Sequence, residues 1–278
     1  MYIDDLFGPG SPIRVIGHRG AAAVAPENTL PSFAHAVEVG ADAVELDLHA
    51  SADGRLVVIH DPTLERTTDG RGAVESRTLE ELRELDAGYG FTPDRGASFP
   101  FRGQGVRIPT LEEVLETIGA LPVVAEIKSA GAGRAMGDWL QTHPARERIL
   151  VGGFKREEVG PAGRHARWRC AYQDELRSYV LLGKCGLGRF AVPRDVDAAM
   201  VPERRGAVRI ITPAFVRRAH ADGLGVFVWT VNRPARIRRL FDWGVDGLVS
   251  DVPGRVRRVL DERAASAHPA AERAAAVS

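Results

Sequence analysis

Residues 13–62 decide the fold, with IRVIGHRG at 13–20, AVELDLH at 43–49 and RLVVIHDP at 55–62. Each piece contains a short apolar run typical of a buried strand. His18, Glu45, Asp47 and His60 lie at or near the ends of these runs. Such residues gather at the carboxyl ends of parallel strands in barrel enzymes, so this stretch indicates both a fold and a site.

The rest of the chain continues the alternation of strands and helices. Strands are predicted near 13–17, 43–48, 55–59, 122–127, 148–152, 167–171, 208–211, 225–231 and 246–250. Helices are predicted at 29–39, 110–118, 132–141, 213–222, 234–243 and 253–263. Strands separated by helices indicate parallel pairing, and about eight such units predict an α/β protein of the TIM (β/α)₈ barrel class. No Gly-x-Gly-x-x-Gly follows the first strand, which disfavours a dinucleotide-binding sheet.

Two segments depart from the alternation. Residues 88–109 are rich in Gly, Pro and aromatic residues, and they predict an ordered insertion after the second barrel strand. Residues 264–278 are mostly alanine and predict a flexible tail. The barrel domain is therefore expected to span residues 1–263.

Composition excludes several classes of protein. The chain has 278 residues, 37 of them basic and 37 acidic, so no surplus charge favours nucleic acid or an anionic membrane. The N-terminus lacks a signal pattern and no apolar run reaches about 18 residues, which predicts a cytoplasmic protein without stable membrane insertion. Two cysteines are too few for a disulfide scaffold. The oligomeric state is left open.

The first two strands indicate a metal and phosphate site. Glu45 and Asp47 are two apart on a strand, so their side chains share a face. Neighbouring carboxylates repel unless a proton or cation lies between them, and oxygen ligands suit Mg²⁺ or Ca²⁺. Ion pairs with arginines are the structural alternative. Arg19 offers a planar fork for a phosphate, so the set indicates metal-assisted cleavage of a phosphoester.

Later strand ends supply further candidates. Glu126 and Lys128 share a face after the apolar run 121–125, and they either join the site or pair with each other. Trp229 is expected near the barrel mouth, as core or as a platform for substrate. His49 is excluded because strand alternation is taken to point it outward. The remaining histidines are interpreted as structural, namely His35, His143, His165, His220 and His268.

Together these stretches resemble the glycerophosphodiester phosphodiesterase family. The matching pieces, in the family's order across about residues 13–262, are GHRG, PENT, ELDLH, VVIHDPTLERTTDG, IPTLEEVL, EIK, VWTVN and WGVDGLVSDVP. The resemblance implies a TIM barrel with a small insertion after the second strand, matching residues 88–109. It also implies one divalent cation, Mg²⁺ or Ca²⁺.

The resemblance also implies a role for each matching residue. The metal ligands are Glu45, Asp47 and Glu126, the acid/base pair is His18 and His60, and the phosphate is held by Arg19 and Lys128. Two histidines with pKa near ~6.5 can serve both ends of the reaction. The sequence does not say which histidine is the acid, or whether water or a glycerol hydroxyl attacks first.

Three functions are compatible with this sequence. The first is cleavage of a small-molecule phosphodiester to sn-glycerol 3-phosphate and an alcohol such as choline or ethanolamine. The second is lysophospholipase D-type cleavage, with Phe91, Phe99 and Phe101 touching an acyl chain. The third is a catalytically silent barrel that binds phosphate esters. An aromatic content of 6% and a net charge of zero favour the first.

Overall fold

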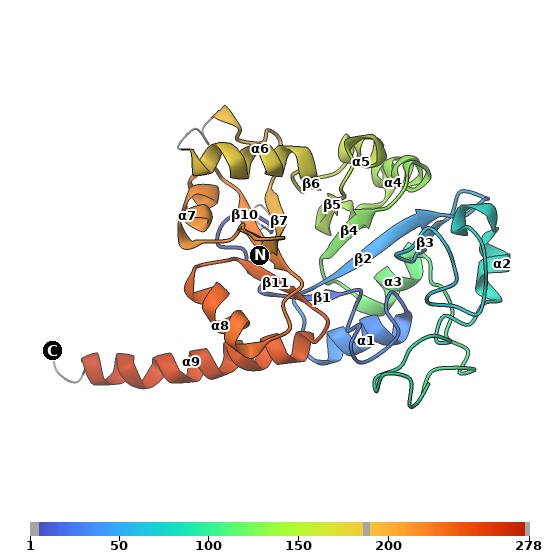
Figure 1. The fold of residues 1–278 in the computed structure, drawn as a ribbon, viewed down its shortest axis with the longest axis horizontal. Helices are drawn as coiled ribbons and strands as arrows, with labels where there is room; N and C mark the ends of the chain where they lie inside the picture. Colours follow the sequence, from blue (N-terminus) through green and yellow to red (C-terminus); the bar gives the residue numbers. More distant parts are fainter. Residues whose placement is uncertain (1–5, 186–189, 276–278) are drawn as a thin grey trace.

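Eight parallel strands form a nearly closed barrel in the computed structural model, which describes residues 6–185 and 190–275 (Figure 1). Their order around the barrel is β6-β5-β4-β2-β1-β11-β10-β7. The strands are β1 (Val15–His18), β2 (Ala43–Ala50), β4 (Val123–Ile127), β5 (Ile149–Gly152), β6 (Trp168–Arg169), β7 (Ala198–Pro202), β10 (Gly225–Trp229) and β11 (Gly247–Ser250). A parallel bridge between Cys170 and Ala198 brings β6 against β7. The predicted (β/α)₈ barrel is confirmed.

Helices follow the strands and cover the outside of the barrel (Figure 1). They are α1 (Leu30–Glu38), α3 (Leu111–Ile118), α4 (Ala130–Thr142), α5 (Arg156–Gly163), α6 (Gln173–Lys184), α7 (Pro213–Ala221), α8 (Pro234–Asp242) and α9 (Pro253–Ala275). Local sequence explains several starts. Thr110 and Glu113 form a reciprocal capping box at α3, and proline opens α7 and α8. Helix α9 continues past residue 263, where its end was predicted. The flexibility of residues 264–278 stays a prediction.

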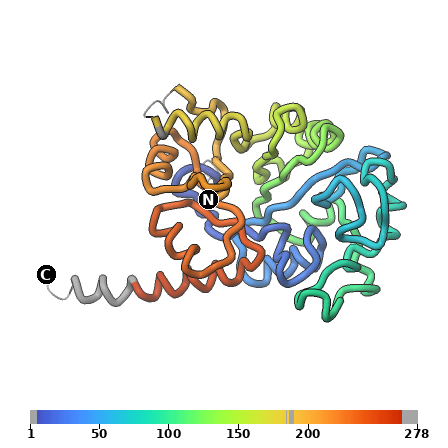
Figure 2. Tube along the Cα trace, viewed as in Figure 1, coloured from blue at the N-terminus to red at the C-terminus, as the bar shows by residue number. Residues whose placement is uncertain are grey.

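The excursion between β2 and α3 is larger than the segment 88–109 predicted from sequence. It begins with β3 (Leu56–Val58), which pairs antiparallel with β2 and so is not a barrel strand. It continues through a 3₁₀ turn, η1 (Val74–Ser76), and α2 (Leu79–Arg83). Its own apolar core is formed by Val57, Ile59, Leu64, Val74, Leu82, Ala87, Val106 and Ile108. Figure 2 shows this excursion on one side of the barrel, next to α1 and α3.

Aromatic side chains organise the second half of this excursion. Phe91 and Phe101 meet edge to face, with ring centroids 5.4 Å apart. The guanidinium of Arg102 lies 4.2 Å from the ring centre of Tyr89 and 3.7 Å from that of Phe99. These aromatic residues therefore contact one another or Arg102, and these contacts hold the loop together.

One predicted strand is wrong. The sixth barrel strand along the chain is β7, whereas the predicted run 208–211 contributes only β9 (Val208–Arg209), which pairs antiparallel with β8 (Arg204–Arg205). The sequence of β7 is Ala-Ala-Met-Val-Pro, which contains a single β-branched residue. The later Val-Arg-Ile-Ile run has higher intrinsic β-propensity, and barrel closure overrides that preference.

Apolar side chains fill the amino-terminal end of the barrel. The ring of Phe7 lies edge to face with Trp168 and Phe227, at centroid distances of 6.1 and 6.2 Å. The backbone of Phe7 passes so close to Gly225 that a Cβ at this position would clash with the Phe7 carbonyl oxygen. Since this end is closed, the polar residues collect at the carboxyl end of the strands, where barrel enzymes place their sites.

Candidate active site

Strand register brings the three predicted carboxylates together. In the parallel pairs His18 lies opposite Glu45, and Asp47 lies opposite Glu126. The carboxylate oxygens of Glu45, Asp47 and Glu126 all come within 4.8 Å of one another. Within residues 6–185 and 190–275, this is the group of acidic, histidine or cysteine side chains that could hold a metal ion.

Burial and the like charges of neighbouring carboxylates shift the pKa values within this cluster. Burial, reinforced by the charge of Asp47, raises the pKa of Glu45 to about 7. Burial and Asp47 also raise the pKa of Glu126, although the Lys128 ammonium opposes them. Burial acts the same way on Asp47, but Lys128 and Arg19 outweigh it and lower its pKa. Lys128 and Arg19 thus stabilise the charged form of Asp47. The charged forms of Glu45 and Glu126 are disfavoured, and a bound cation would offset that cost.

Two cations already lie against Asp47. The Lys128 ammonium is 2.9 Å from Asp47 Oδ1 and 2.5 Å from Glu126 Oε1. Arg19 Nε lies 3.0 Å from Asp47 Oδ2, and Arg19 Nη1 donates to Glu27 Oε1 at 2.7 Å. The Glu126–Lys128 pairing considered from the sequence is therefore present. It does not remove either residue from the site, because both side chains face the same carboxylates.

The chain turns tightly to place Arg19. Its φ of 49° lies in the left-handed region, which is costly for a residue with a side chain. Its backbone N–H donates to Glu45 Oε2 at 3.0 Å. Gly17 makes room for the turn, because a Cβ there would clash with the carbonyl of Gly20. The GHRG sequence is thus needed for the backbone as well as for its side chains.

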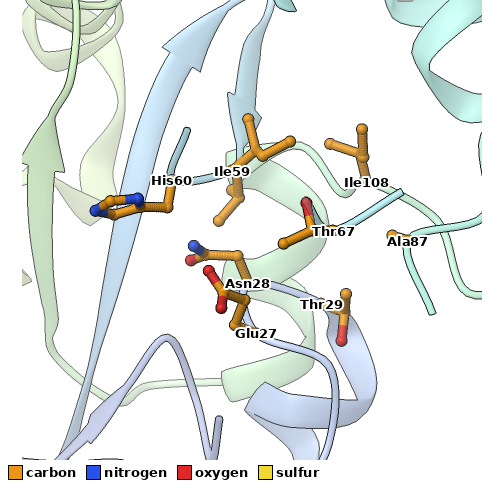
Figure 3. A pocket seen from close by; sticks show the side chains of 9 residues that line it. Glu27, Asn28, Thr29, Ile59, His60, Thr67, Ala87 and Ile108 are labelled. Atoms are coloured by element: carbon orange, nitrogen blue, oxygen red, sulfur yellow. The ribbon is translucent and has the colours of Figure 1, made fainter. Parts of the chain in front are cut away.

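Asn28 and Glu27, which precede α1, support the site. Asn28 Nδ2 donates to Asp47 Oδ2 at 2.8 Å, and the cap of α1 is Thr29. Glu27 accepts from Arg19 and from Arg66, whose Nη1 lies 2.8 Å from Glu27 Oε2. Figure 3 shows Glu27 and Asn28 with His60 around a small cavity that Thr29, Ile59, Thr67, Ala87 and Ile108 also line. Asn28 therefore holds the Asp47 carboxylate in place, and Glu27 holds the Arg19 guanidinium.

Each predicted catalytic histidine has an aspartate at Nδ1. His18 Nδ1 lies 2.6 Å from Asp251 Oδ1, and His18 Nε2 lies 3.9 Å from Glu45 Oε2. Burial lowers the pKa of His18, but Asp251 and Glu45 outweigh it and raise that pKa above its usual value. His60 Nδ1 lies 2.6 Å from Asp61 Oδ1. Both rings are therefore oriented by carboxylates, which leaves Nε2 for chemistry.

Asp61 is itself held by an arginine. Arg66 Nε donates to Asp61 Oδ2 at 2.5 Å. This hydrogen bond, together with that of His60, outweighs burial and lowers the pKa of Asp61 to about 2. Because Arg66 also contacts Glu27, it links the loop that carries His60 to the loop beside Arg19.

The outward orientation predicted for His49 was wrong. His49 is two residues beyond Asp47, so strand alternation places it on the same face as Glu45 and Asp47. It is buried, and its Nε2 lies 3.2 Å from the carbonyl oxygen of His60. Burial lowers the pKa of His49. A neutral His49 that donates to this carbonyl supports the backbone of the His60 loop.

Trp229 lies near the site, with an aromatic partner that the sequence did not indicate. Phe154, which follows β5, meets Trp229 edge to face at a centroid distance of 6.2 Å and is 45% exposed. The Lys128 ammonium is 5.8 Å from the centre of the Phe154 ring. The two rings are therefore placed beside a phosphate-binding candidate, as a platform for substrate requires.

The residues present fit a hard divalent cation. The donor set consists of carboxylate oxygens, which Mg²⁺ and Ca²⁺ prefer. Asp47 Oδ1 is buried and lies 2.9 Å from the Lys128 ammonium. The carboxyl group of Glu45, whose pKa is raised to about 7 by burial and by the charge of Asp47, is one that a bound cation would stabilise.

Comparisons with known proteins agree with this geometry. A model of the glycerophosphoryl diester phosphodiesterase family matches residues 18–255. The chain belongs to this family. Relatives of the chain are named glycerophosphodiester phosphodiesterase. As a member of this family, the protein is a phosphoric diester hydrolase. One such relative, from Caldanaerobacter subterraneus subsp. tengcongensis, is 35% identical over 86% of this chain and 94% of its own length.

Solved structures of family members have the same fold. A putative glycerophosphoryl diester phosphodiesterase from Silicibacter pomeroyi is 29% identical, with a TM-score of 0.74 over 94% of this chain and 97% of that one. An Oleispira antarctica phosphodiesterase, in complex with the product sn-glycerol-3-phosphate, is 27% identical. Its TM-score is 0.70 over 89% of this chain and 96% of that one. The resemblance inferred from the sequence is confirmed.

The supporting residues that the sequence did not indicate share a positional signal. Phe154 continues the inward-facing register of Leu150 and Gly152 on β5. Asp251 does the same after Val249 on β11. Continuing each inward register to its next position, two residues after Gly152 and two residues after Val249, would have found both. No helix in the described part of the chain is both long and apolar enough to cross a membrane.

Proposed function

We propose that this protein hydrolyses glycerophosphodiesters to glycerol 3-phosphate and an alcohol, with one divalent cation, Mg²⁺ or Ca²⁺, as cofactor. The observation that carries the proposal is the meeting of three carboxylates and two histidines, each with an aspartate at Nδ1, at one barrel mouth. The product bound to the Oleispira relative supports the choice of substrate. The balanced charge of the chain supports a small-molecule partner rather than a nucleic acid.

Glu45, Asp47 and Glu126 would hold the cation, which when bound stabilises the negative charge that builds on the phosphoryl oxygens. Arg19 and Lys128 add positive charge beside the same carboxylates, in position to bind the phosphate. Within the described residues, Nη2 of Arg19 has no partner, so this nitrogen is available to a ligand.

His18 and His60 would move the two protons. One ring accepts at Nε2 the proton of the attacking group, water or a glycerol hydroxyl, and the other gives a proton to the departing alkoxide. Asp251 and Asp61 each lie 2.6 Å from the Nδ1 atom of their histidine, so both rings present Nε2 as the working atom. Phe154 and Trp229 form an apolar wall that would contact the carbon atoms of the substrate.

The two alternative functions lack structural support of this kind. A lysolipid enzyme must bury an acyl chain, which contributes roughly 0.8 kcal/mol per CH₂. Phe91 and Phe101 pack on each other, and Phe99 packs on Arg102, contacts that favour a role in packing the loop over a role in binding an acyl chain. A silent binding barrel would have no use for a second histidine with its own aspartate.

The proposed function is tested by a side-by-side assay with Mg²⁺ and with Ca²⁺. Glycerophosphocholine, glycerophosphoethanolamine and lysophosphatidylcholine should be supplied separately at equal concentration. We expect turnover of both water-soluble diesters with release of sn-glycerol 3-phosphate. A clear preference for the lysolipid would support the lipid-cleaving alternative, and turnover of none of the three would favour the silent barrel.

Cation affinity should depend on pH through Glu45. Because the pKa of its carboxyl group is about 7 without a cation, binding below pH 7 must release a proton. We expect the affinity to fall by about tenfold for each pH unit below 7 and to level off above it. Calorimetric titration from pH 5.5 to 8, in buffers with different ionisation heats, counts the protons released. An affinity independent of pH, with no proton release, would contradict this role.

We also propose a cytoplasmic location for the enzyme. Cys170 is buried, Cys185 is exposed, and neither takes part in a disulfide. An exposed free thiol suits a reducing compartment.

A further inference from the structure

A short chain of hydrogen bonds reaches His18 at its Nδ1 atom. Asp251 Oδ1 lies 2.6 Å from His18 Nδ1. Asn232 Nδ2 donates to Asp251 Oδ2 at 2.6 Å. Asn232 Oδ1 accepts from Ser250 Oγ at 2.9 Å and from the backbone N–H of Asp251 at 3.0 Å. The chain therefore runs from the end of β11 through the loop after β10 to the ring at the end of β1.

The direction of each bond that the Asn232 side chain makes is fixed by one donor. A backbone N–H can only donate, so the group of Asn232 that faces it must be the carbonyl oxygen. The amide nitrogen of Asn232 must then face Asp251. The Asp251 carboxylate accepts from Asn232, and it accepts from His18 only if Nδ1 carries a proton.

The arrangement leaves Nε2 of His18 directed at the site. This atom lies 3.9 Å from Glu45 Oε2, whereas Nδ1 faces Asp251. Asp251 is partly shielded, with its side chain 26% exposed. A ring held in this way cannot exchange its two nitrogens without breaking the Asp251 hydrogen bond.

We propose that Asp251 is a positioning residue that keeps the proton of His18 on Nδ1 and directs Nε2 toward the carboxylate cluster, and that Asn232 fixes the orientation of Asp251. The catalytic consequence rests on the proposed function, because it assumes that His18 transfers a proton. The tautomer itself does not depend on that assumption. A purely structural role, in which the same bonds tie β11 to β1, predicts a loss of stability instead.

Asp251→Asn should reverse the tautomer. Asn232 Nδ2 must still find an acceptor, so the new amide will turn its oxygen toward Asn232 and its nitrogen toward His18 Nδ1. The ring then has to carry its proton on Nε2. We expect kcat to fall by about 10- to 100-fold, the usual cost of losing a supporting hydrogen bond, with KM and cation affinity little changed.

Exchanging the side chains of Asp251 and Asn232 should return the proton of His18 to Nδ1. In the double variant Asp251→Asn/Asn232→Asp, one oxygen of the new carboxylate still accepts from Ser250 and the backbone. Its other oxygen accepts from the new amide, which turns its own oxygen back to His18. We expect the double variant to recover kcat by roughly fivefold or more over the single variant, although the charge beside the ring is lost.

A second histidine–aspartate pair serves as the matched control. His220 Nε2 lies 2.8 Å from Asp246 Oδ2, and Asp246 precedes β11 at the opposite end of the strands. His220→Gln removes this pair without touching the site. We expect wild-type kcat from this variant and any loss to appear only in thermal unfolding.

The tautomer can be read directly by ¹⁵N NMR of the imidazole rings at alkaline pH, with His18→Ala used for assignment. We expect a protonated Nδ1 in the wild type and in the exchanged variant, and a protonated Nε2 in Asp251→Asn. A wild-type ring protonated at Nε2 overturns the proposal even if the single variant does not fold. Normal kcat in Asp251→Asn, or no recovery on exchange, also overturns it. If the wild type cleaves no diester, the proposed function fails and the catalytic part fails with it, while NMR still decides the tautomer.

Discussion

Replacing Glu45 by glutamine should lower turnover by about 10³-fold while leaving the metal-free protein at least as stable as before. Glu45 contributes one of the three carboxylates that would hold the cation, and an amide oxygen is a much weaker ligand for Mg²⁺ or Ca²⁺. The shape of the side chain is kept, and the amide oxygen can still accept from the backbone N–H of Arg19. A change that removes function without removing stability distinguishes a ligand from a structural residue.

The stability of the metal-free protein should change in a defined direction with pH. The pKa of Glu45 is raised in the folded state, so its contribution to stability is complete below the unfolded value, near 4.5, and is lost as pH rises through about 7. Glutamine carries no charge and does not suffer this loss. At pH 8 we expect Glu45→Gln to be more stable than the parent by about 1–3 kcal/mol, and at pH 4 we expect no gain.

The measurements for Glu45→Gln are thermal unfolding in chelator at pH 4 and pH 8, together with calorimetric titration of the cation. Glu116→Gln, on the exposed face of α3, is the matched control and should behave like the wild type in both. Normal cation affinity in Glu45→Gln would remove Glu45 from the ligand set. A loss of stability at pH 8 would show that its charge stabilises the fold.

Replacing either catalytic histidine by alanine should lower kcat by about 10²-fold or more, the usual scale for a positioned proton donor or acceptor. His18 and His60 each have an aspartate at Nδ1, and neither is a member of the carboxylate cluster. Both variants should therefore still bind the cation. Steady-state kinetics measures the loss of kcat, and the cation titration measures whether cation binding is retained.

His35→Ala is the control for the histidine variants. His35 lies on α1, where its Nδ1 is 3.4 Å from Glu38 Oε2, away from the barrel mouth. It should keep wild-type turnover. If His18→Ala or His60→Ala retained near-normal turnover, that histidine would lose its proposed role in proton transfer.

The sequence predicted the parts of the site that depend on one strand at a time. His18, Glu45, Asp47 and Glu126 are recognisable because an apolar run precedes each and barrel strands end at one face. The strand β7 was missed because its Ala- and Met-rich sequence has weak β-propensity, and only closure of the barrel selects it.

Which supporting residues pair with each other could not be predicted, because these contacts join distant parts of the chain. Asp251 lies 233 residues from His18, and Arg66 lies 39 residues from Glu27. Nothing in either local pattern indicates the partner. The role of Asn28 likewise depends on where β2 brings Asp47. Such partners follow from the strand order of the barrel, which fixes which loops meet at its mouth.

The central claim, that a cation held by Glu45, Asp47 and Glu126 is needed for phosphodiester hydrolysis, is tested most directly by removing and restoring that cation. The protein is dialysed exhaustively against chelator, and release of sn-glycerol 3-phosphate from glycerophosphocholine is followed as Mg²⁺ or Ca²⁺ is added back. We predict no turnover in the stripped protein and full recovery once one site per chain is filled. Full activity in the stripped protein would contradict the account.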